Sequence, residues 1–218
     1  AEHPEKFHQL WQAGIDAQKD MNVIWNLGFR GQGDCPFWDN DPQYQTSESR
    51  GELMSKLIMM QYELVKKACP NARCCTNLYG ETMELYQDGY LNLPDNIIKI
   101  WADNGYGKMV TRRQGNHNPR IYALPKEGGH GSHGIYYHAS FYDLQAANHI
   151  TMSTNTADFL AGELKNVIDH NVKDYWIINC SNVKPHVYTL DLIAALWNQK
   201  DVNVKEHRKQ YIANYYGI

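Results

Sequence analysis

The sequence predicts an α/β fold of the (β/α)8 barrel type, with about five of the eight strand–helix units present. Short apolar runs, rich in β-branched and aromatic residues, recur along the chain, and helix-like segments lie between most of them. Each apolar run ends in Asp, Glu, Asn or Arg. Polar residues at the carboxyl ends of successive parallel strands are how such a barrel builds a site.

The composition fits one folded domain and argues against two classes of partner. With 218 residues, the chain is long enough to bury a substantial core. Its net charge is −3 and it has no concentrated basic stripe, so we expect no nucleic-acid partner. No uninterrupted apolar run reaches the roughly 18 residues of a membrane-spanning helix, so we expect no membrane partner either.

The five cysteines are an odd number, so at least one thiol lacks a disulfide partner within the chain. Cys74 and Cys75 are adjacent in an apolar run and are expected to be small buried hydrophobic residues. No CxxC or Cys/His zinc spacing appears, and we expect neither a metal nor another cofactor. Because the chain starts at Ala1 and not at Met, we expect it to be part of a longer protein. A missing signal peptide then says nothing about secretion.

Helix and strand are expected to alternate in the first third of the chain. Residues 4–20 predict a helix, because apolar residues fall on one face at helical spacing. A strand starts at Val23, and the Pro-, Asn- and Asp-rich residues 35–42 predict an irregular loop. A second helix starts near Thr46 or Ser47, where a hydroxyl can cap it. The expected apolar faces of the two helices are Phe7, Leu10, Trp11 and Ile15, and Leu53, Leu57, Met60 and Leu64.

The same alternation continues to the C-terminus, with one long interruption. The remaining strands are expected at residues 73–79, 97–102, 135–142 and 175–178. The remaining helices are expected at residues 81–90, 156–168, 189–198 and 204–218. Thr156 can cap the second of these, whose expected apolar face is Phe159, Leu160, Leu164, Val167 and Ile168. Residues 104–134 form the longest irregular region, and a glycine-rich loop of that length is more often functional or mobile than structural.

Five strand–helix units cannot close an eight-stranded barrel, because parallel strands need neighbours on both sides. Either three strands lie outside this chain, or the chain forms a smaller open sheet. A helix that comes before any strand favours the first alternative, since it would follow an absent strand. Open sheet edges also favour association, and self-association as a homodimer is one way of covering them.

Acidic residues follow four of the predicted strands. Glycoside hydrolysis needs two carboxyl groups, one protonated as the acid and one ionised as base or nucleophile. The alternative for each acid is that it caps the helix that follows. Four such acids in succession favour a site over four separate caps. They are Asp34, Glu81, Asp103 and Asp143.

Arg30 and the histidines are weaker candidates when each is taken alone. Arg30 lies in a glycine-rich loop and suits a bidentate grip on a carboxylate, but an ion pair with a nearby acid is the alternative. His130, His133, His138 and His149 match no zinc spacing, and His138 is expected to bind a sugar hydroxyl instead. The loop sequence GFRGQG fails both the dinucleotide and the P-loop patterns, and no GxSxG appears.

At these motifs the sequence resembles glycoside hydrolase family 115, the xylan α-1,2-glucuronidases. The resemblance is carried in order by WNLGFRGQGDCPFW (25–38), CCTNLYGE (74–81), IWADNGYG (100–107), RRQGNHNP (112–119), HGIYYHASFYDLQAANHITM (133–152) and DYWIINCSNVKPHVY (174–188). It implies a large multidomain protein with a (β/α)8 catalytic barrel. Residues 1–218 would be part of that catalytic domain, roughly its strands four to eight.

The resemblance implies inverting removal of α-1,2-linked glucuronic acid, or its 4-O-methyl form, from glucuronoxylan. Glu81 matches the general acid, and Arg30 matches a residue that binds the uronate carboxylate. Asp34 is the candidate base, although the family's acids on the first three strands have no counterpart here. The residues expected to bind the sugar are Tyr79, Asp103, Asn104, Tyr137, His138 and Asn179.

For the whole protein the resemblance implies a xylan α-1,2-glucuronidase that is secreted or periplasmic. The partners are then glucuronoxylan or its oligosaccharides, and no cofactor is needed. We expect these 218 residues alone to be inactive, because they hold only part of the barrel. One alternative is a non-catalytic carbohydrate-binding protein in which the acids accept sugar hydroxyls. The other is a metal-dependent sugar isomerase on the same fold.

Overall fold

The structure of the chain, a computed structural model, describes residues 3–31, 33, 35–111, 121–126, 129–141, 155–199 and 201–218. Its elements are α1 (Pro4–Gln18), β1 (Ile24–Leu27), η2 (Phe37–Asn40), α2 (Ser47–Ala68), β2 (Arg73–Leu78), α3 (Glu81–Gln87), β3 (Ile98–Ala102), β4 (His133–Ser140), α4 (Ala157–Asp169), β5 (Tyr175–Cys180), η3 (Lys184–His186), α5 (Val187–Gln199) and α6 (Val204–Tyr216). The five predicted strands and the helices predicted around them are confirmed.

The strands follow one another in a single sheet in the order β1-β2-β3-β4-β5. β1 pairs with β2 in parallel, with Ile24 opposite Arg73, and β4 pairs with β5 in parallel, with His138 opposite Asn179. The chain divides into two compact units, residues 1–100 with 130–132 and residues 101–129 with 133–218. Sequential parallel strands with helices between them confirm the predicted α/β class.

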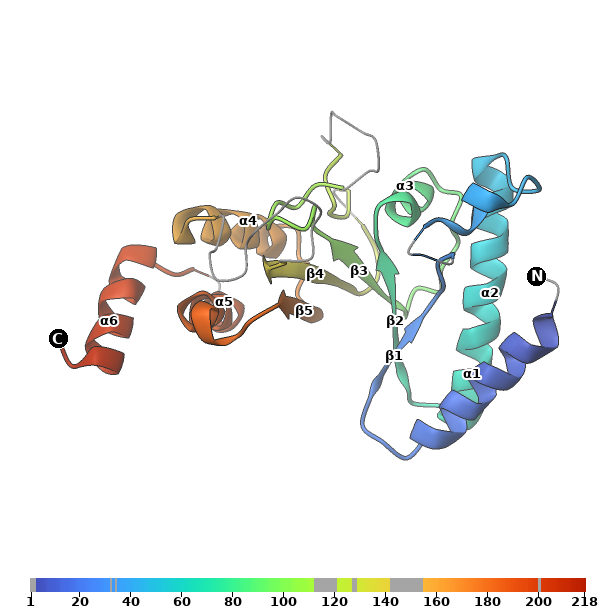
Figure 1. Cartoon of the computed structure of the whole chain (residues 1–218), viewed down its shortest axis with the longest axis horizontal. Helices are drawn as coiled ribbons and strands as arrows, with labels where there is room; N and C mark the ends of the chain where they lie inside the picture. The colour runs from blue at the N-terminus through green and yellow to red at the C-terminus, as the bar shows by residue number, and fades with distance from the viewer. Residues whose placement is uncertain are drawn as a thin grey trace. The chain divides into compact units, whose positions relative to one another are not determined.

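In the first unit, α1 and α2 lie side by side next to β1 and β2 (Figure 1). Thr46 caps α2 as expected, since its hydroxyl oxygen accepts the backbone N–H of Ser49 at 3.2 Å. The buried face of α2 is one residue away from the expected one and consists of Gly51, Met54, Ile58, Gln61 and Val65. The polar Gln61 belongs to this face because it accepts the Gly28 N–H at 2.7 Å.

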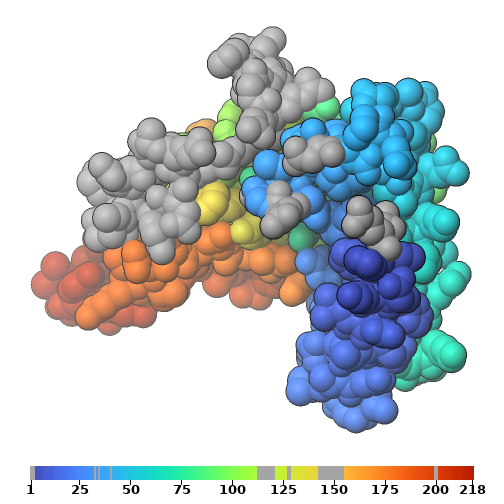
Figure 2. Space-filling model, turned by 45° about the vertical axis from the view of Figure 1, so that its right-hand side comes forward, coloured from blue at the N-terminus to red at the C-terminus, as the bar shows by residue number. Residues whose placement is uncertain are grey.

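The expected apolar face of α1 is only partly confirmed. Ile15 is buried, but Phe7 and Leu10 are 50% and 66% exposed. Figure 2 shows the outer side of this helix in dark blue. None of the described helices is both long enough and apolar enough to cross a membrane.

In the second unit, α4 and α5 pack together beside β4 and β5, and α6 contacts both helices (Figure 1). The Thr156 hydroxyl caps α4 by accepting the Phe159 N–H at 3.1 Å, as the sequence predicted. The helix buries four apolar residues at helical spacing, namely Leu160, Ala161, Leu164 and Val167. Leu160, Leu164 and Val167 of this face were predicted, because the period of an amphipathic helix can be read from the sequence.

Several described residues of the long region that was expected to be irregular are buried in the core. Val110 and Tyr122 form an antiparallel bridge, and Met109 and Ala123 are 0% exposed. Strand β4 also begins at His133, two residues before the expected start. The expectation that the glycine-rich loop is mobile stays a prediction. Residues 112–120 and 127–128 lie outside the described residues.

Candidate functional site

The structure places the predicted site residues in two groups, one in each compact unit. The first group is Arg30, Tyr79 and Glu81, and the second is Asp103, Asn104, Tyr137, His138 and Asn179. Asp34, the candidate base, and Asp143 lie outside the described residues.

Arg30 and Glu81 form an ion pair in the first unit. Nη2 and Nε of Arg30 lie 2.9 and 3.1 Å from the same Glu81 carboxylate oxygen, Oε1. The guanidinium carbon also lies 5.4 Å from the centre of the Tyr79 ring. The two charged side chains are 27% and 23% exposed, so both remain within reach of solvent and ligand. For Arg30, an ion pair with a nearby acid was the alternative to binding a ligand carboxylate, and the structure shows that ion pair.

A tight turn at the end of β2 brings Glu81 to this position. Gly80 has φ +52° and lets the chain pass from the strand directly into α3, whose first residue is Glu81. The Tyr79 N–H donates to the Thr82 hydroxyl at 2.8 Å, and that hydroxyl donates in turn to the Tyr79 carbonyl at 3.0 Å. Thr82 therefore holds the turn, a role that its place in the sequence did not reveal.

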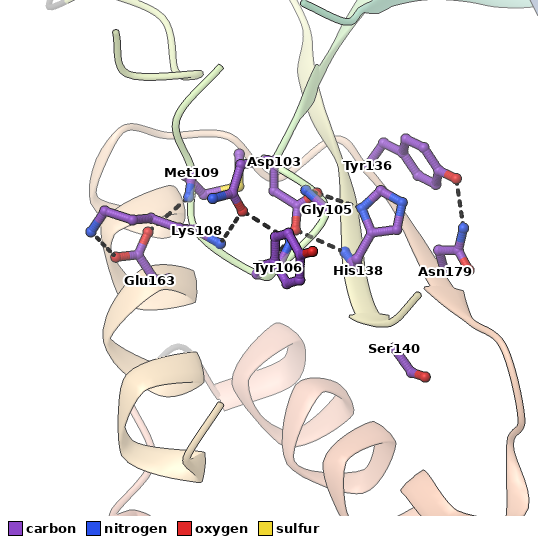
Figure 3. Close-up of polar contacts among 12 residues, drawn as sticks. Asp103, Gly105, Tyr106, Lys108, Met109, Tyr136, His138, Ser140, Glu163 and Asn179 are labelled. Atoms are coloured by element: carbon purple, nitrogen blue, oxygen red, sulfur yellow. Dashed lines mark hydrogen bonds and ion pairs between the residues drawn. The ribbon is translucent and has the colours of Figure 1, made fainter. Parts of the chain in front are cut away.

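Asp103 lies directly after β3 and is 1% exposed (Figure 3). Its Oδ1 accepts the Gly105 N–H at 3.0 Å, and its Oδ2 accepts the N–H groups of Gly107 and His138 at 2.8 and 3.1 Å. The Nδ1 atom of His138 also contacts Oδ1. Both glycines have positive φ, +83° and +78°, which lets the loop curl around the carboxylate. Asp103 thus caps a loop and holds an imidazole.

The His138 ring lies between Asp103 and Tyr136 in Figure 3. Its centre is 4.6 Å from the Tyr136 ring, at an interplanar angle of 53°, and 4.6 Å from the Phe141 ring, at 22°. The Asn179 side-chain amide donates to the Tyr136 hydroxyl at 2.7 Å. His138, which is 3% exposed, is thereby fixed on two faces and at one edge.

Asn104 holds a turn, and Tyr137 is buried in the core. The side-chain oxygen of Asn104 accepts the N–H groups of Tyr106 and Lys108 at 2.9 and 3.2 Å, which tightens the loop after β3. Tyr137 is 0% exposed. Burial raises the pKa of Tyr137, and the negative charges of Asp103 and Glu163 raise it further, so its phenol stays protonated.

Comparison with known proteins decides the family. The sequence model of glycosyl hydrolase family 115 matches residues 1–218, the whole chain. The chain belongs to glycoside hydrolase family 115. A search of curated proteins gives no match.

A similar solved structure is that of a family GH115 4-O-methyl-α-glucuronidase with specificity for decorated arabinogalactans. It has a TM-score of 0.75 and 21% sequence identity to this chain. The match covers 95% of this chain and 26% of that protein, so the GH115 chain spans about a quarter of its length. The likeness confirms the predicted α/β fold of the (β/α)8 barrel type, present here in part.

Sequence reasoning missed several residues that shape the second group of this GH115 chain. Glu163 on α4 accepts the Met109 N–H at 2.9 Å and lies 3.5 Å from the Lys108 amine, so it ties the loop after β3 to the helix. Tyr136 was missed although it lies two residues before His138 on the same strand. The two-residue period of a strand was a signal that could have found it.

The described residues hold no group of three or more His, Cys, Asp or Glu side chains that could bind a metal ion. His133 is instead part of the core, 4% exposed, and its Nδ1 accepts the Trp101 indole N–H at 3.1 Å. A buried histidine that accepts a hydrogen bond from another side chain of the protein has a structural role in its strand.

Proposed function

We propose that this chain is part of a glycoside hydrolase that releases α-linked glucuronic acid, or its 4-O-methyl form, from a decorated polysaccharide. Membership of family 115 and the likeness to a 4-O-methyl-α-glucuronidase support the proposal. Within the chain, the observation that carries it is the ion pair between Arg30 and Glu81. It sets a carboxyl group, which a glycosidase needs, beside a guanidinium that suits a uronate.

In the proposed inverting reaction, Glu81 donates a proton to the glycosidic oxygen while a second carboxylate activates a water molecule on the opposite face of the sugar. Arg30 exchanges its pair with Glu81 for the carboxylate of the sugar, which it binds through its planar fork of N–H donors, and Glu81 is then released to carry the proton that it donates. Inversion requires the two carboxyl groups to lie about 6.5–9.5 Å apart, which leaves room for the water. Asp34 is the proposed base.

Tyr79, Asn104, Tyr137, His138 and Asn179 complete the proposal as residues that bind or support the sugar. His138 and Asn179 lie opposite each other on neighbouring strands, and imidazole and amide groups can hydrogen-bond sugar hydroxyls. The proposed polysaccharide is glucuronoxylan with α-1,2 linkages. Because the matched enzyme is described as specific for decorated arabinogalactans, the two polysaccharides must be compared directly.

The test is release of glucuronic acid and 4-O-methylglucuronic acid from glucuronoxylan and from a decorated arabinogalactan. This chain and a longer protein that contains it are assayed side by side. We expect release by the longer protein only, because residues 1–218 supply part of a barrel. Release by both would place the catalytic pair within these residues. Binding without release by a folded longer protein would favour a carbohydrate-binding protein instead.

Replacing the proposed acid tests the mechanism. In the longer protein, Glu81→Gln should lower turnover about a hundredfold or more, because the amide has no proton to give to the leaving oxygen. Polysaccharide binding should persist, since the side chain keeps its size. Asp88→Asn, an exposed position at the end of the same helix, is the control and should leave both unchanged. Near-normal turnover of Glu81→Gln would remove Glu81 from the acid role.

A further inference from the structure

The carboxylate of Asp103 has no place for a sugar hydroxyl. Each of its two oxygens accepts at least one backbone N–H, and His138 approaches it as well. The side chain is 0% exposed. A group so enclosed can influence a ligand only through a neighbour that reaches the ligand. The side chain that Asp103 contacts is His138, whose backbone N–H and ring Nδ1 both meet the carboxylate, and that His138 meets a ligand rests on the proposed function.

The contact also fixes which nitrogen of His138 carries the proton. A carboxylate is only an acceptor, so the Nδ1 atom that faces Oδ1 of Asp103 must carry hydrogen to avoid lone-pair repulsion. In a neutral imidazole, Nε2 then has the free lone pair and acts as an acceptor. The stacked Phe141 ring and the tilted Tyr136 ring prevent the imidazole from turning over.

The loop that follows Asp103 is anchored at a second point. Glu163 on α4 holds the backbone of Met109 and the amine of Lys108 (Figure 3). The carboxylate of Asp103 therefore sits in a loop that is fixed at both ends, and its position relative to β4 is set by the fold. This arrangement separates the two carboxylates by role, since Asp103 touches the imidazole and Glu163 does not.

We propose that Asp103 is a positioning residue that holds His138 as the Nδ1–H tautomer, with Nε2 presented as a hydrogen-bond acceptor to a sugar hydroxyl. That the ligand is a sugar rests on the proposed function, whereas the assignment of the tautomer rests on the geometry of Asp103 alone. The proposal replaces direct sugar binding by Asp103, the role expected from its place after a strand.

The first test measures the tautomer in this chain itself. The protein is labelled with 15N-histidine, and His138 is assigned through backbone connectivities in NMR spectra at about pH 8.5, where ordinary histidines are neutral. We expect a proton on Nδ1, with its resonance shifted downfield by the carboxylate, and no proton on Nε2. A proton on Nε2 in the unaltered chain would overturn the proposal without any variant.

Asp103→Asn should reverse the tautomer. The position of Oδ2 faces two backbone N–H donors and that of Oδ1 only one, from Gly105, so the amide oxygen goes to the Oδ2 position and the amide NH2 goes toward His138 Nδ1. Nδ1 then accepts, and the proton moves to Nε2. Glu163→Gln is the matched control, because it loosens the same loop without touching the imidazole, and it should leave the Nδ1 proton in place. An Nδ1 proton retained in Asp103→Asn would contradict the proposal.

The second test uses the longer protein and its uronic-acid release. Asp103→Asn should lower kcat/KM by about tenfold or more, since the wrong tautomer presents a donor where an acceptor is needed. In a His138→Gln background the same change should have little further effect, because Asp103 acts through His138. Additive losses would overturn the positioning role. If the longer protein releases no uronic acid, the proposed function fails while the tautomer result stands.

Discussion

At the scale of single residues, burial decides what each carboxylate of this chain can do. Asp103 is 1% exposed and its oxygens accept three backbone N–H groups, whereas the Glu81 side chain is 23% exposed and pairs with Arg30. Removing a partner from the buried group leaves a costly unpaired polar atom. The partly exposed Glu81 can exchange its partner for a ligand at small cost. Two acids in equivalent sequence positions therefore differ in role.

Arg30→Lys separates recognition from stability. Lysine keeps the positive charge but loses the planar fork, so we expect KM for the uronic-acid substrate in the longer protein to rise several-fold. The free energy of unfolding should change by less than about 1 kcal/mol, because the pair with Glu81 is partly exposed. Kinetics and urea denaturation measure the two effects. Arg73→Lys, at an exposed arginine, is the control, and an unchanged KM in Arg30→Lys would argue against carboxylate binding by Arg30.

The burial of His186 predicts how the stability of the chain depends on pH. It is 2% exposed, and burial lowers its pKa below the ordinary value of 6.5. The unfolded chain therefore binds a proton more readily than the folded chain, and stability falls as the pH drops below 6.5 toward the folded pKa. Above 6.5 this residue contributes no pH dependence.

Denaturant titrations of the unaltered chain and of His186→Gln between about pH 5 and pH 8 test this linkage. Part of the stability lost at acid pH should be retained in His186→Gln, because glutamine does not titrate. His170→Gln serves as the control, since His170 is exposed. This variant should lose as much stability at acid pH as the unaltered chain. Identical slopes for the two variants would contradict the assigned role of His186.

At the scale of elements, two helical glycines with opposite surroundings show where helices touch the rest of the fold. A Cβ added at Gly51 in α2 would lie 2.1 Å from the Tyr90 carbonyl oxygen, whereas one added at Gly14 in α1 would have nothing within 4 Å. Glycine is therefore required at the first position by close approach to backbone. At the second it only weakens the helix.

Gly51→Ala should destabilise the chain by about 1–3 kcal/mol or more, because backbone must shift to admit the methyl group. Gly14→Ala should stabilise it by about 0.5–1 kcal/mol, through better helix propensity and a less flexible unfolded chain. Chemical denaturation measures both. If the two substitutions changed stability in the same direction, the close contact between α2 and Tyr90 would be wrong.

At the scale of the whole molecule, the five cysteines report how completely the strands are covered. Cys74 and Cys75 in β2 are each 2% exposed, and burial raises the pKa of Cys75 to about 12, with Cys74 adding to the shift. Cys35, Cys69 and Cys180 are only partly buried. Thiol reactivity requires both access and thiolate, so the two groups should react at different rates.

A thiol-specific disulfide reagent at about pH 8 should therefore modify three thiols of the native chain quickly and all five after denaturation. Cys180 should be the slowest of the three, because burial also raises its pKa. Cys75→Ser should leave the number of fast-reacting thiols unchanged, whereas Cys35→Ser should reduce it by one. Five fast thiols in the native chain would mean that β2 is not covered as described.

The sequence by itself determined the order and type of the elements. Strands and helices follow from periods of two and 3.6 residues, which depend only on neighbours along the chain. The caps at Thr46 and Thr156 were found for the same reason, since each bonds a residue three positions ahead. The motifs also indicated the family, which the match over residues 1–218 confirms. Self-association as a homodimer stays a prediction.

Only the tertiary structure decided which side chains meet. Arg30 pairs with Glu81 across 51 positions, and Asp103 pairs with His138 across 35. Such contacts depend on strand register, where a shift of one residue turns every side chain to the other face. The buried face of α2 differs by one residue from the expected one for a related reason, because Gln61 bonds to Gly28 in the loop after β1. Local patterns place residues on a fold, and packing between distant segments gives each its partner.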